Sequence, residues 1–457
     1  YKRQSLDLAN SGFLVYLVER KAAIGGRMGQ LDKTFPTNDC SMCMLAPKLN
    51  ECDRHPNIWI LTSAEIQKLD GRPGDFTVTL VRRPRYVNMT KCTACGTCTD
   101  YCPVVIKDDY NEGLSSTKTL HIDYPQAIPA AFYVDPTTCL FLTRQECKQC
   151  EQVCGAGAID FDQQETKIDV RVGGVILSPG FEPFDPQAKG TYGYGQFPNV
   201  VTSLEFERIL SATGPFHGHV RRPSDGKEPK NIAWIQCVGS RNPSIGRGYC
   251  SSVCCMYAIK EAMLAKEHAS GELDTAIFYI DIRTPGKDFE KFYDRAGQDV
   301  GIRFVKSRID TITQNDKTQD LLIRYTDRSS KRMEEVFDLV VLSVGLGVSE
   351  QIRSLSEKLG VTLDPYGFAE TSSFSPVNTS KQGIYVCGAF QQPKDIPESV
   401  MEASASAAAA CAALSEARHQ LTKAHPYADE RDVTGEEPKV GVFVCHCGIN
   451  IAGTVDV

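Results

Sequence analysis

The sequence predicts an α/β fold in which two open-sheet domains share the chain with a small, cysteine-rich α+β insert. Three observations lead to this prediction. Short apolar runs that end on glycine recur along the chain and are typical of buried parallel strands. Eight cysteines are concentrated between residues 92 and 154. The 457 residues exceed what one ordinary core accommodates, which indicates several domains.

The chain opens with what we expect to be the end of a helix, a turn and a buried strand. The helix is expected over residues 5–10 and the strand over 14–18, which closes on Glu19 and Arg20. In a dinucleotide-binding βαβ unit, an acid at that place accepts the ribose hydroxyl of the cofactor. The glycine-rich turn that should precede the helix is absent, so we expect the sequence to begin inside its first βαβ unit.

Glycine turns further along supply the other candidate contacts for a nucleotide cofactor. The pair Gly25-Gly26 exposes backbone, and Arg27 adds a cation suited to a pyrophosphate. The strand-like runs 174–177 and 383–387 each lead into a glycine turn, and the second continues into a helix whose N-terminus suits an electron-rich flavin edge. The candidate contacts are Glu19, Arg20, Gly25, Gly26, Arg27, Met28, Ser178, Pro179, Gly180, Gly388, Ala389, Phe390, Pro397, Glu398 and Ser399.

Together these segments resemble the thioredoxin-reductase-like flavoproteins, which contain two Rossmann-type nucleotide-binding domains. The run 340–345 repeats the pattern of a strand followed by glycine and indicates the second of these domains. The resemblance extends over nearly the whole chain and implies FAD as the cofactor.

The first four cysteines follow the spacing Cys-x2-Cys-x2-Cys-x3-Cys-Pro, which is the ligand pattern of a two-cluster ferredoxin. In that pattern three cysteines of one group serve one cluster and the fourth serves the other. We therefore assign two [4Fe-4S] clusters, one to Cys92, Cys95, Cys98 and Cys154, and one to Cys139, Cys147, Cys150 and Cys102. The long gap from Cys139 to Cys147 predicts a small loop insertion.

Zinc and disulfides are the alternatives for these cysteines. Zinc sites close with four ligands in paired Cys-x2-Cys hooks, and they give no reason for the outlying fourth cysteine of each group. Disulfides require an oxidising compartment, whereas the cysteine usage indicates a reducing cytoplasm.

The second domain lacks the glycine-rich loop with which such flavoproteins bind NADPH. After the strand expected from residue 231, the chain instead carries Cys237, Cys250, Cys254 and Cys255. We interpret these four as ligands of a further [4Fe-4S] cluster, in which the adjacent Cys254 and Cys255 bind neighbouring corners of the cube. The alternative is a pair of buried thiols with chance neighbours, because free cysteine is common in cores.

Four features now coincide: the FAD scaffold, the ferredoxin inserted into it, the Cys237 to Cys255 set in place of the nucleotide loop, and the segment 38–45 with Cys40 and Cys43. This combination resembles the heterodisulfide reductase A-subunit family. The resemblance implies flavin-based electron bifurcation, in which FAD sends one electron to ferredoxin and the other to a higher-potential acceptor. It also implies a homodimeric complex with subunits of B and C type, and a hydrogenase or formate dehydrogenase joined through a small iron–sulfur subunit.

The resemblance leaves three finer expectations. Lys260 is the candidate for a cation that tunes the flavin near N5, and a solvated helix lysine is the alternative. Cys40 and Cys43 either complete a cluster with ligands from elsewhere or form a structural or redox-active pair. Cys445 and Cys447 resemble the start of the family's N-terminal, cluster-bearing domain, so we expect the polypeptide to continue beyond residue 457.

We expect six segments along the chain. They are a first FAD segment (1–85), the ferredoxin insert (86–164), a second FAD segment (165–230), the domain with the cysteine set (231–347), a closing FAD segment (348–422), and a linker with the start of a further domain (423–457).

Two other functions compete with the bifurcating flavoprotein. An NAD(P)H-dependent enzyme of the glutamate synthase small-subunit or dihydropyrimidine dehydrogenase type shares the FAD and ferredoxin parts but needs the missing nucleotide loop. A non-bifurcating conduit or scaffold, as in sulfate-respiration or benzoyl-CoA reductase complexes, would not require the flavin-facing glycines. The net charge of -7 argues against nucleic acid as a partner, and we find no apolar stretch that would span a membrane.

Overall fold

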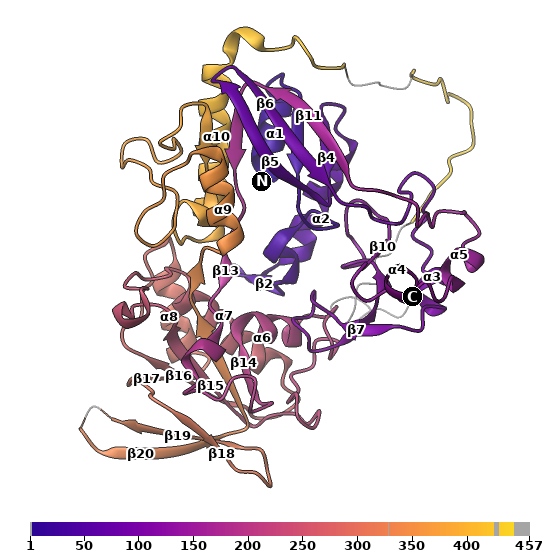
Figure 1. The fold of residues 1–457 in the computed structure, drawn as a ribbon. Helices are drawn as coiled ribbons and strands as arrows, with labels where there is room; N and C mark the ends of the chain where they lie inside the picture. Colours follow the sequence, from indigo (N-terminus) through magenta and orange to yellow (C-terminus); the bar gives the residue numbers. More distant parts are fainter. Residues whose placement is uncertain (1, 328, 425–428, 443–457) are drawn as a thin grey trace.

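The fold is described from a computed structural model that covers residues 2–327, 329–424 and 429–442. It is α/β, with an upper domain that holds α1 (Lys2–Asn10) and α10 (Ile396–Ala413), a lower sheet domain, and an insert beside both (Figure 1). No helix among the described residues is long and apolar enough to cross a membrane.

The first domain is assembled from segments that lie far apart in the sequence. Helix α1 (Lys2–Asn10) leads to strand β1 (Val15–Val18), which pairs in parallel with β4 (Ile58–Leu61). Strand β12 (Val175–Leu177) pairs in parallel with β23 (Ile384–Val386). The remaining elements around them are β2 (Lys33–Thr34), β3 (Asp39–Cys40), α2 (Ser41–Arg54), α9 (Glu350–Leu359) and α10 (Ile396–Ala413), which packs against α1.

An antiparallel sheet of three strands extends this domain. It consists of β5 (Ala64–Arg72), β6 (Asp75–Arg82) and β11 (Thr166–Val172). Alternate residues of β6 are buried, as the alternating sequence predicts, and Leu80 lies opposite Ile168. Because β6 precedes the insert and β11 follows it, the two ends of the insert leave neighbouring strands.

The second domain contains a five-stranded parallel sheet in the order β14-β21-β15-β16-β17. These strands are β14 (Val200–Thr202), β15 (Asn231–Val238), β16 (Asp274–Tyr279), β17 (Arg303–Lys306) and β21 (Leu339–Val344). Helices α6 (Ser203–Leu210), α7 (Cys254–His268) and α8 (Phe289–Gln298) pack on it around the fully buried Trp234. The short pair β13 (Glu182–Pro183) and β22 (Leu346–Gly347) joins the two domains.

One boundary differs from the sequence expectation. Residues 200–210 were assigned to the second FAD segment, but β14 pairs with β21 and belongs to the sheet of the second domain. The sequence of β14, Val-Val-Thr, does not indicate which sheet the strand joins, because strand pairing depends on residues far away in the sequence.

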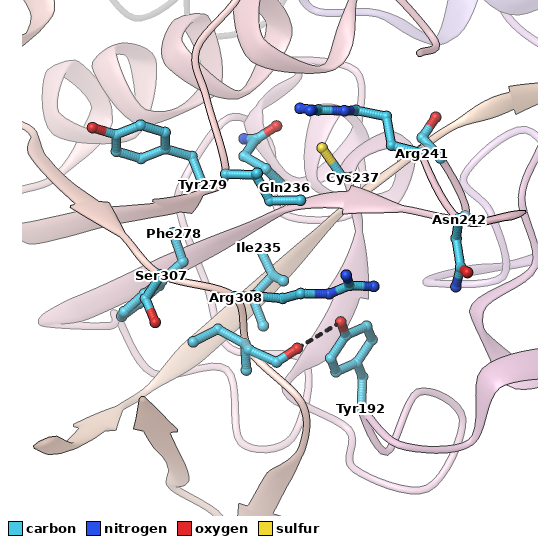
Figure 2. Close-up of a pocket in the computed structure, with 14 residues that line it drawn as sticks. Tyr192, Ile235, Gln236, Cys237, Arg241, Asn242, Phe278, Tyr279, Ser307 and Arg308 are labelled. Carbon is cyan, nitrogen blue, oxygen red and sulfur yellow. Dashed lines mark hydrogen bonds between the residues drawn. The ribbon is translucent and has the colours of Figure 1, made fainter. Parts of the chain in front are cut away.

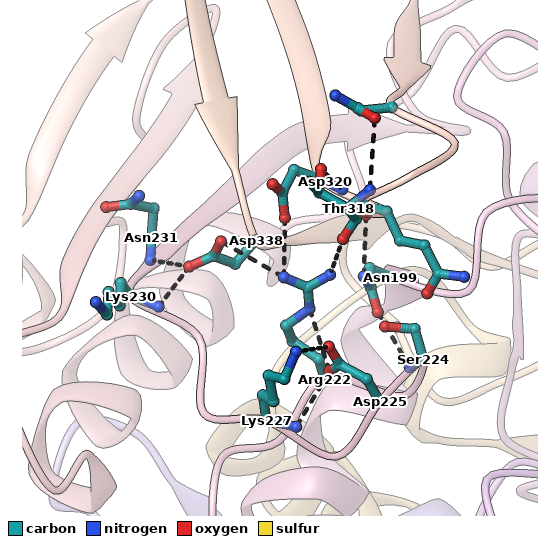
Figure 3. Close-up of polar contacts among 12 residues, drawn as sticks. Asn199, Arg222, Ser224, Asp225, Lys227, Lys230, Asn231, Thr318, Asp320 and Asp338 are labelled. Atoms are coloured by element: carbon teal, nitrogen blue, oxygen red, sulfur yellow. Dashed lines mark hydrogen bonds and ion pairs between the residues drawn. The ribbon is translucent and has the colours of Figure 1, made fainter.

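A twisted hairpin sheet projects from the second domain at the bottom of Figure 1. Its strands are β18 (Ile312–Gln314), β19 (Leu321–Thr326) and β20 (Arg332–Phe337). Figure 3 shows the buried Arg222 at its base, where the guanidinium binds Asp320 at 2.8 Å and the carbonyl of Thr318 at 2.8 Å. Asp338 lies 3.7 Å from the same guanidinium, so one cation joins the hairpin to the parallel sheet.

The insert is a compact unit of short elements. They are α3 (Thr97–Asp100), β7 (Val105–Lys107), β8 (Ser116–Lys118), β9 (Leu120–His121), β10 (Tyr133–Val134), α4 (Leu140–Arg144) and α5 (Gln149–Val153). A bridge between Val87 and Ile159 closes its base. The buried Arg85 donates to the carbonyls of Ala22, Ala131 and Phe132 and thereby ties the insert to the first domain.

Candidate functional site

The structure brings the first predicted group of cysteines together at the edge of the insert's core, where Cys98 is buried and Cys95 is exposed. Burial, and after it the thiols of Cys154, Cys92 and Cys95, raise the pKa of Cys98 to about 11. These are the three partners assigned to Cys98 from the spacing. Four thiols that repel one another as thiolates fit a cationic iron cluster, which would neutralise their charge.

The second group converges in the same way. Burial, and after it the thiols of Cys139 and Cys102, raise the pKa of Cys150 to about 12. Cys147, the fourth member, is exposed, with φ at 72°. Cys102 and Cys139 are buried in one apolar cluster with Cys98, so the two groups share a core.

The third group lies at the carboxyl end of the parallel sheet. Cys237 is the next-to-last residue of β15, and Cys254 and Cys255 begin α7. Burial is the main cause that raises the pKa of Cys255 to about 11, and the thiols of Cys237 and Cys250 contribute to that rise. Among the described residues, no set of three or more His, Cys, Asp or Glu is placed to hold a single metal ion. The four thiols that bind a [4Fe-4S] cluster lie farther apart than the ligands of a single metal ion, because the cluster lies between them.

Figure 2 shows the pocket at this end of the sheet, where a nucleotide would lie in a Rossmann-type domain. Gln236, Cys237 and Arg241 face it from β15 and the loop that follows, and Arg308 enters from the loop after β17. The cavity measures about 20 Å³. That volume is comparable to one water molecule and far below a cofactor pocket.

Two of the predicted flavin-facing segments, those after β12 and β23, meet at the start of α1. The side-chain amide of Gln4 donates to Ser178 Oγ at 2.7 Å and to Cys387 Sγ at 3.6 Å, so the ends of β12 and β23 converge on this helix. Gln4 Oε1 is buried and has no donor among the described residues. An unpaired buried acceptor fits a ligand that carries hydroxyl groups, as FAD does.

The Gly25-Gly26 turn is covered by two tyrosines of the insert, which sequence reasoning missed. Tyr124 donates its hydroxyl to the carbonyl of Ile24, and Tyr110 donates to the carbonyl of Gly29. The two rings stack with their centroids 5.2 Å apart. The insert therefore shapes the turn that was predicted to face the cofactor.

Arg27 was predicted to lie along a pyrophosphate, but here it binds an acid of the insert. Its guanidinium lies 2.7 Å from Glu112 Oε1 and 2.9 Å from Gln30 Oε1. Met28 accepts from Ser41 Oγ through its carbonyl, and Glu19 accepts from the amide of Lys21 at 2.8 Å. Arg20 is exposed, and its carbonyl accepts from Arg83.

Some of the remaining predicted flavin contacts are open, and others already form hydrogen bonds with residues of the chain. Nothing lies within 4 Å of the place that a Cβ on Gly180 would take, and Pro179 is exposed. At α10, Glu398 and Ser399 bind the capping residue Asp395, and Pro397 is exposed. The amide of Gly388 donates to Glu402 at 2.9 Å, beside Ala389 and the buried Phe390.

Lys260 is buried, which excludes the solvated-lysine alternative. Its ammonium pairs with Glu207 of α6, and both side chains are almost fully enclosed. The same ammonium donates to the carbonyl of Lys33 at 2.8 Å. The backbone amide of Asp32 donates to Glu207 at 3.0 Å. Burial, and after it the charge of Glu207, raise the pKa of the Asp32 carboxyl to about 6. Asp32 and Glu207 had no signal in the sequence, because they are 175 residues apart.

Cys40 and Cys43 form a disulfide at the start of α2, beside the Gly26–Gln30 turn. The disulfide corresponds to the second expectation, a structural or redox-active pair. Cys445 and Cys447 lie outside the described residues.

A cleft of about 640 Å³ lies between the first domain, the insert and the second domain. Cations and acids both line it, among them Lys21, Arg27, Lys107, Glu112 and Glu205.

Comparison with known proteins gives one family match and several relatives. The 4Fe-4S binding domain family matches residues 85–107, which include the first cysteine group. The chain is 42% identical over 409 residues to the A subunit of the H(2):CoB-CoM heterodisulfide,ferredoxin reductase of Methanothermobacter marburgensis, covering 89% of this chain and 61% of that protein. It is 45% identical over 413 residues to the second iron-sulfur A subunit of the CoB–CoM heterodisulfide reductase of Methanopyrus kandleri, covering 90% and 62%.

The chain thus spans about three fifths of the length of these curated relatives. Among solved structures, thioredoxin reductase of T. acidophilum is similar over 90% of this chain and 94% of that one, with a TM-score of 0.48 and 12% identity.

A further relative is covered over more of its length. The chain is 37% identical over 473 residues to a protein of Archaeoglobus profundus that is named as similar to the heterodisulfide reductase A subunit, covering 94% of this chain and 67% of that protein. The chain belongs to the heterodisulfide reductase A-subunit family.

Proposed function

We propose that this chain is the FAD- and iron–sulfur-carrying electron-transfer subunit of a heterodisulfide-reductase-like complex. The observation that carries the proposal is the convergence of Cys98 with Cys92, Cys95 and Cys154, in a chain whose relatives are named as the A subunits of such reductases. When bound, FAD exchanges electrons in pairs or singly, and each iron–sulfur cluster exchanges one.

The chain's own groups would hold and tune these cofactors. The amide of Ala158 donates to Cys154 Sγ at 3.2 Å, and the amide of Ser252 donates to Cys250 Sγ at 3.4 Å. Hydrogen bonds to the ligand sulfurs are one of the means by which proteins set cluster potentials. Lys260 donates to the carbonyl of Lys33, three residues after the turn Gly26–Gln30, and would place a buried cation near the flavin.

The finer parts of the proposal follow from the family resemblance. Electron pairs would be split at FAD between ferredoxin and a higher-potential acceptor, in a cytoplasmic, homodimeric complex. Subunits of B and C type, and a hydrogenase or formate dehydrogenase joined by a small iron–sulfur subunit, would be the partners. The 20 Å³ cavity beside Cys237 supports this function over an NAD(P)H-dependent one, which needs room for a dinucleotide.

Cofactor analysis tests the proposal. We expect the anaerobically purified chain to contain one FAD and about 12 irons or more, at four per cluster. Titration with dithionite should reduce both cofactor types, whereas NADH and NADPH should leave them oxidised. Rapid reduction by NADPH, or a chain that binds no flavin, contradicts the proposal.

A further inference from the structure

A group of buried carboxylates surrounds Lys260, and one of them has no role in the function proposed above. Glu261 is the next residue on α7, and none of its surface is exposed. Glu207 pairs with Lys260, and Asp32 binds the other oxygen of Glu207 through its amide. Three acids and one lysine thus lie in one region from which water is excluded.

The contacts of Glu261 indicate a protonated acid. Trp234 Nε1 donates to Glu261 Oε2 at 2.9 Å. The other oxygen, Oε1, is buried and has no donor among the described residues, and the side chain of Glu207 lies within hydrogen-bonding reach of the Glu261 carboxyl. An ionised carboxylate can only accept hydrogen bonds, so a hydrogen bond between two carboxyl groups requires a proton on one of them.

The charges around Glu261 lead to the same assignment. Burial, and then the charge of Glu207, raise the pKa of Glu261 well above its usual value, and Lys260 opposes them. The other titratable groups that face this region are Asp32, Lys33 and Arg208 around Glu207, and the buried phenol of Tyr257. Lys260 is already paired with Glu207, which leaves Glu261 without a cation of its own.

We propose that Glu261 is a proton store for the cofactor site. It holds a proton at neutral pH and releases it when Lys260 gives its own proton to the reduced cofactor. The proton of Glu261 passes to Glu207, and Glu207 passes a proton to Lys260 Nζ. Glu261 ends as a carboxylate and Lys260 is again an ammonium, with no electron moved in the relay. This role rests on the proposed function, which supplies the reduction that draws the proton.

Infrared spectroscopy of the chain with its clusters and flavin tests whether Glu261 holds a proton. We expect a buried carboxylic-acid C=O band at pH 8 that shifts in D2O. Glu261→Gln keeps the size of the side chain and an acceptor for Trp234, and it should remove the band. Glu267→Gln, an exposed position on the same helix, should keep it. A wild-type protein without the band, or a Glu261→Gln variant that retains it, overturns the proposal.

The difference between reduced and oxidised spectra tests whether the proton moves. We expect the acid band of the wild-type protein to disappear when dithionite bleaches the flavin, and to be absent from the difference spectrum of Glu261→Gln. If the flavin bleaches and the carboxylic-acid band does not change, Glu261 is not a proton store, and the proposed function is unaffected. A flavin that does not bleach refutes the proposed function and, with it, the role of the store.

Discussion

Tyr124 of the insert donates its hydroxyl to the carbonyl of Ile24, the residue before the Gly25-Gly26 turn. A Cβ on Gly25 would lie closer to this hydroxyl than real Cβ atoms approach any neighbour. The backbone of Gly25 has φ at 147°, which L side chains rarely adopt. The absence of a side chain at residue 25 therefore lets the insert close over the turn.

Gly25→Ala tests this contact. We expect lower flavin content and unchanged iron content, because the turn must shift while the insert retains its own core. Gly74→Ala is the matched control, since its φ is also positive and nothing lies within 4 Å of a Cβ there. Equal flavin content in both variants would show that the tyrosine contact has no role in cofactor binding.

Cys255→Ser should remove one cluster and leave FAD bound. The hydroxyl is a poor ligand for iron, and Cys255 lies with Cys237 and Cys250 away from the two groups of the insert. Iron and flavin analysis measures the result, with Cys411→Ser on α10 as the control. Iron content equal to that of the wild-type protein would refute the third cluster site.

Arg85→Ala should destabilise the attachment of the insert. The variant leaves the buried carbonyls of Ala22, Ala131 and Phe132 without a donor, and each unsatisfied group costs about 1–3 kcal/mol. We expect a total loss of about 3 kcal/mol or more in the free energy of unfolding. Arg83→Ala, an exposed pair with Glu65, should cost less than about 1 kcal/mol. Similar losses in the two variants would contradict the anchoring role.

Arg222→Met should loosen the hairpin sheet at its base. Removing the cation leaves Asp320 and Asp338 without their shared partner, which costs about 3–5 kcal/mol for buried pairs, and less here because both carboxylates are partly exposed. Amide hydrogen exchange should accelerate in β18–β20 and stay unchanged in β15 and β16. Protection of the hairpin equal to that in the exposed control Arg324→Met would contradict this prediction.

The raised pKa of Asp32 predicts a pH-dependent effect on stability. A carboxyl whose folded-state pKa is raised stabilises the fold below its unfolded pKa of 3.8, and this contribution is lost as pH rises through about 6. Asp32→Asn should therefore gain stability relative to the wild-type protein between pH 4 and 6, by about 3 kcal/mol at most. Denaturant titrations at several pH values measure the difference, with Asp70→Asn at an exposed position as the control. A difference that does not vary with pH would contradict the raised pKa.

The apolar runs that end on glycine and the spacing of the cysteines were sufficient to predict the fold class and the family, and both predictions are confirmed. The apolar run 14–18 predicts a buried strand, and the structure has β1 over Val15–Val18, in which Leu17 is buried and the other three residues are half-buried. The grouping of Cys98 with Cys92 and Cys95 follows from spacing, because a short loop limits which thiols can meet, whereas Cys154 is assigned from the ligand pattern of two-cluster ferredoxins.

Contacts between distant segments could not be predicted in this way. Arg27 was expected to bind a pyrophosphate, yet its partner Glu112 lies 85 residues away and in another unit. Likewise, nothing near Lys260 in the sequence indicates Glu207. A single sequence shows which residues carry charge, but it does not show which opposite charges the fold brings together.

Several contacts hold the insert to the first domain, among them the bridge of Ile24 with Ile128, the guanidinium of Arg85, and the tyrosine pair over the Gly25 turn. A module tied at its ends and again in its middle cannot swing as a tethered carrier does. Electron exchange between its cysteine groups and the first domain would then depend on a constant tunnelling distance. Its rate would be insensitive to solvent viscosity, unlike the rate of a carrier that must diffuse and dock for each electron.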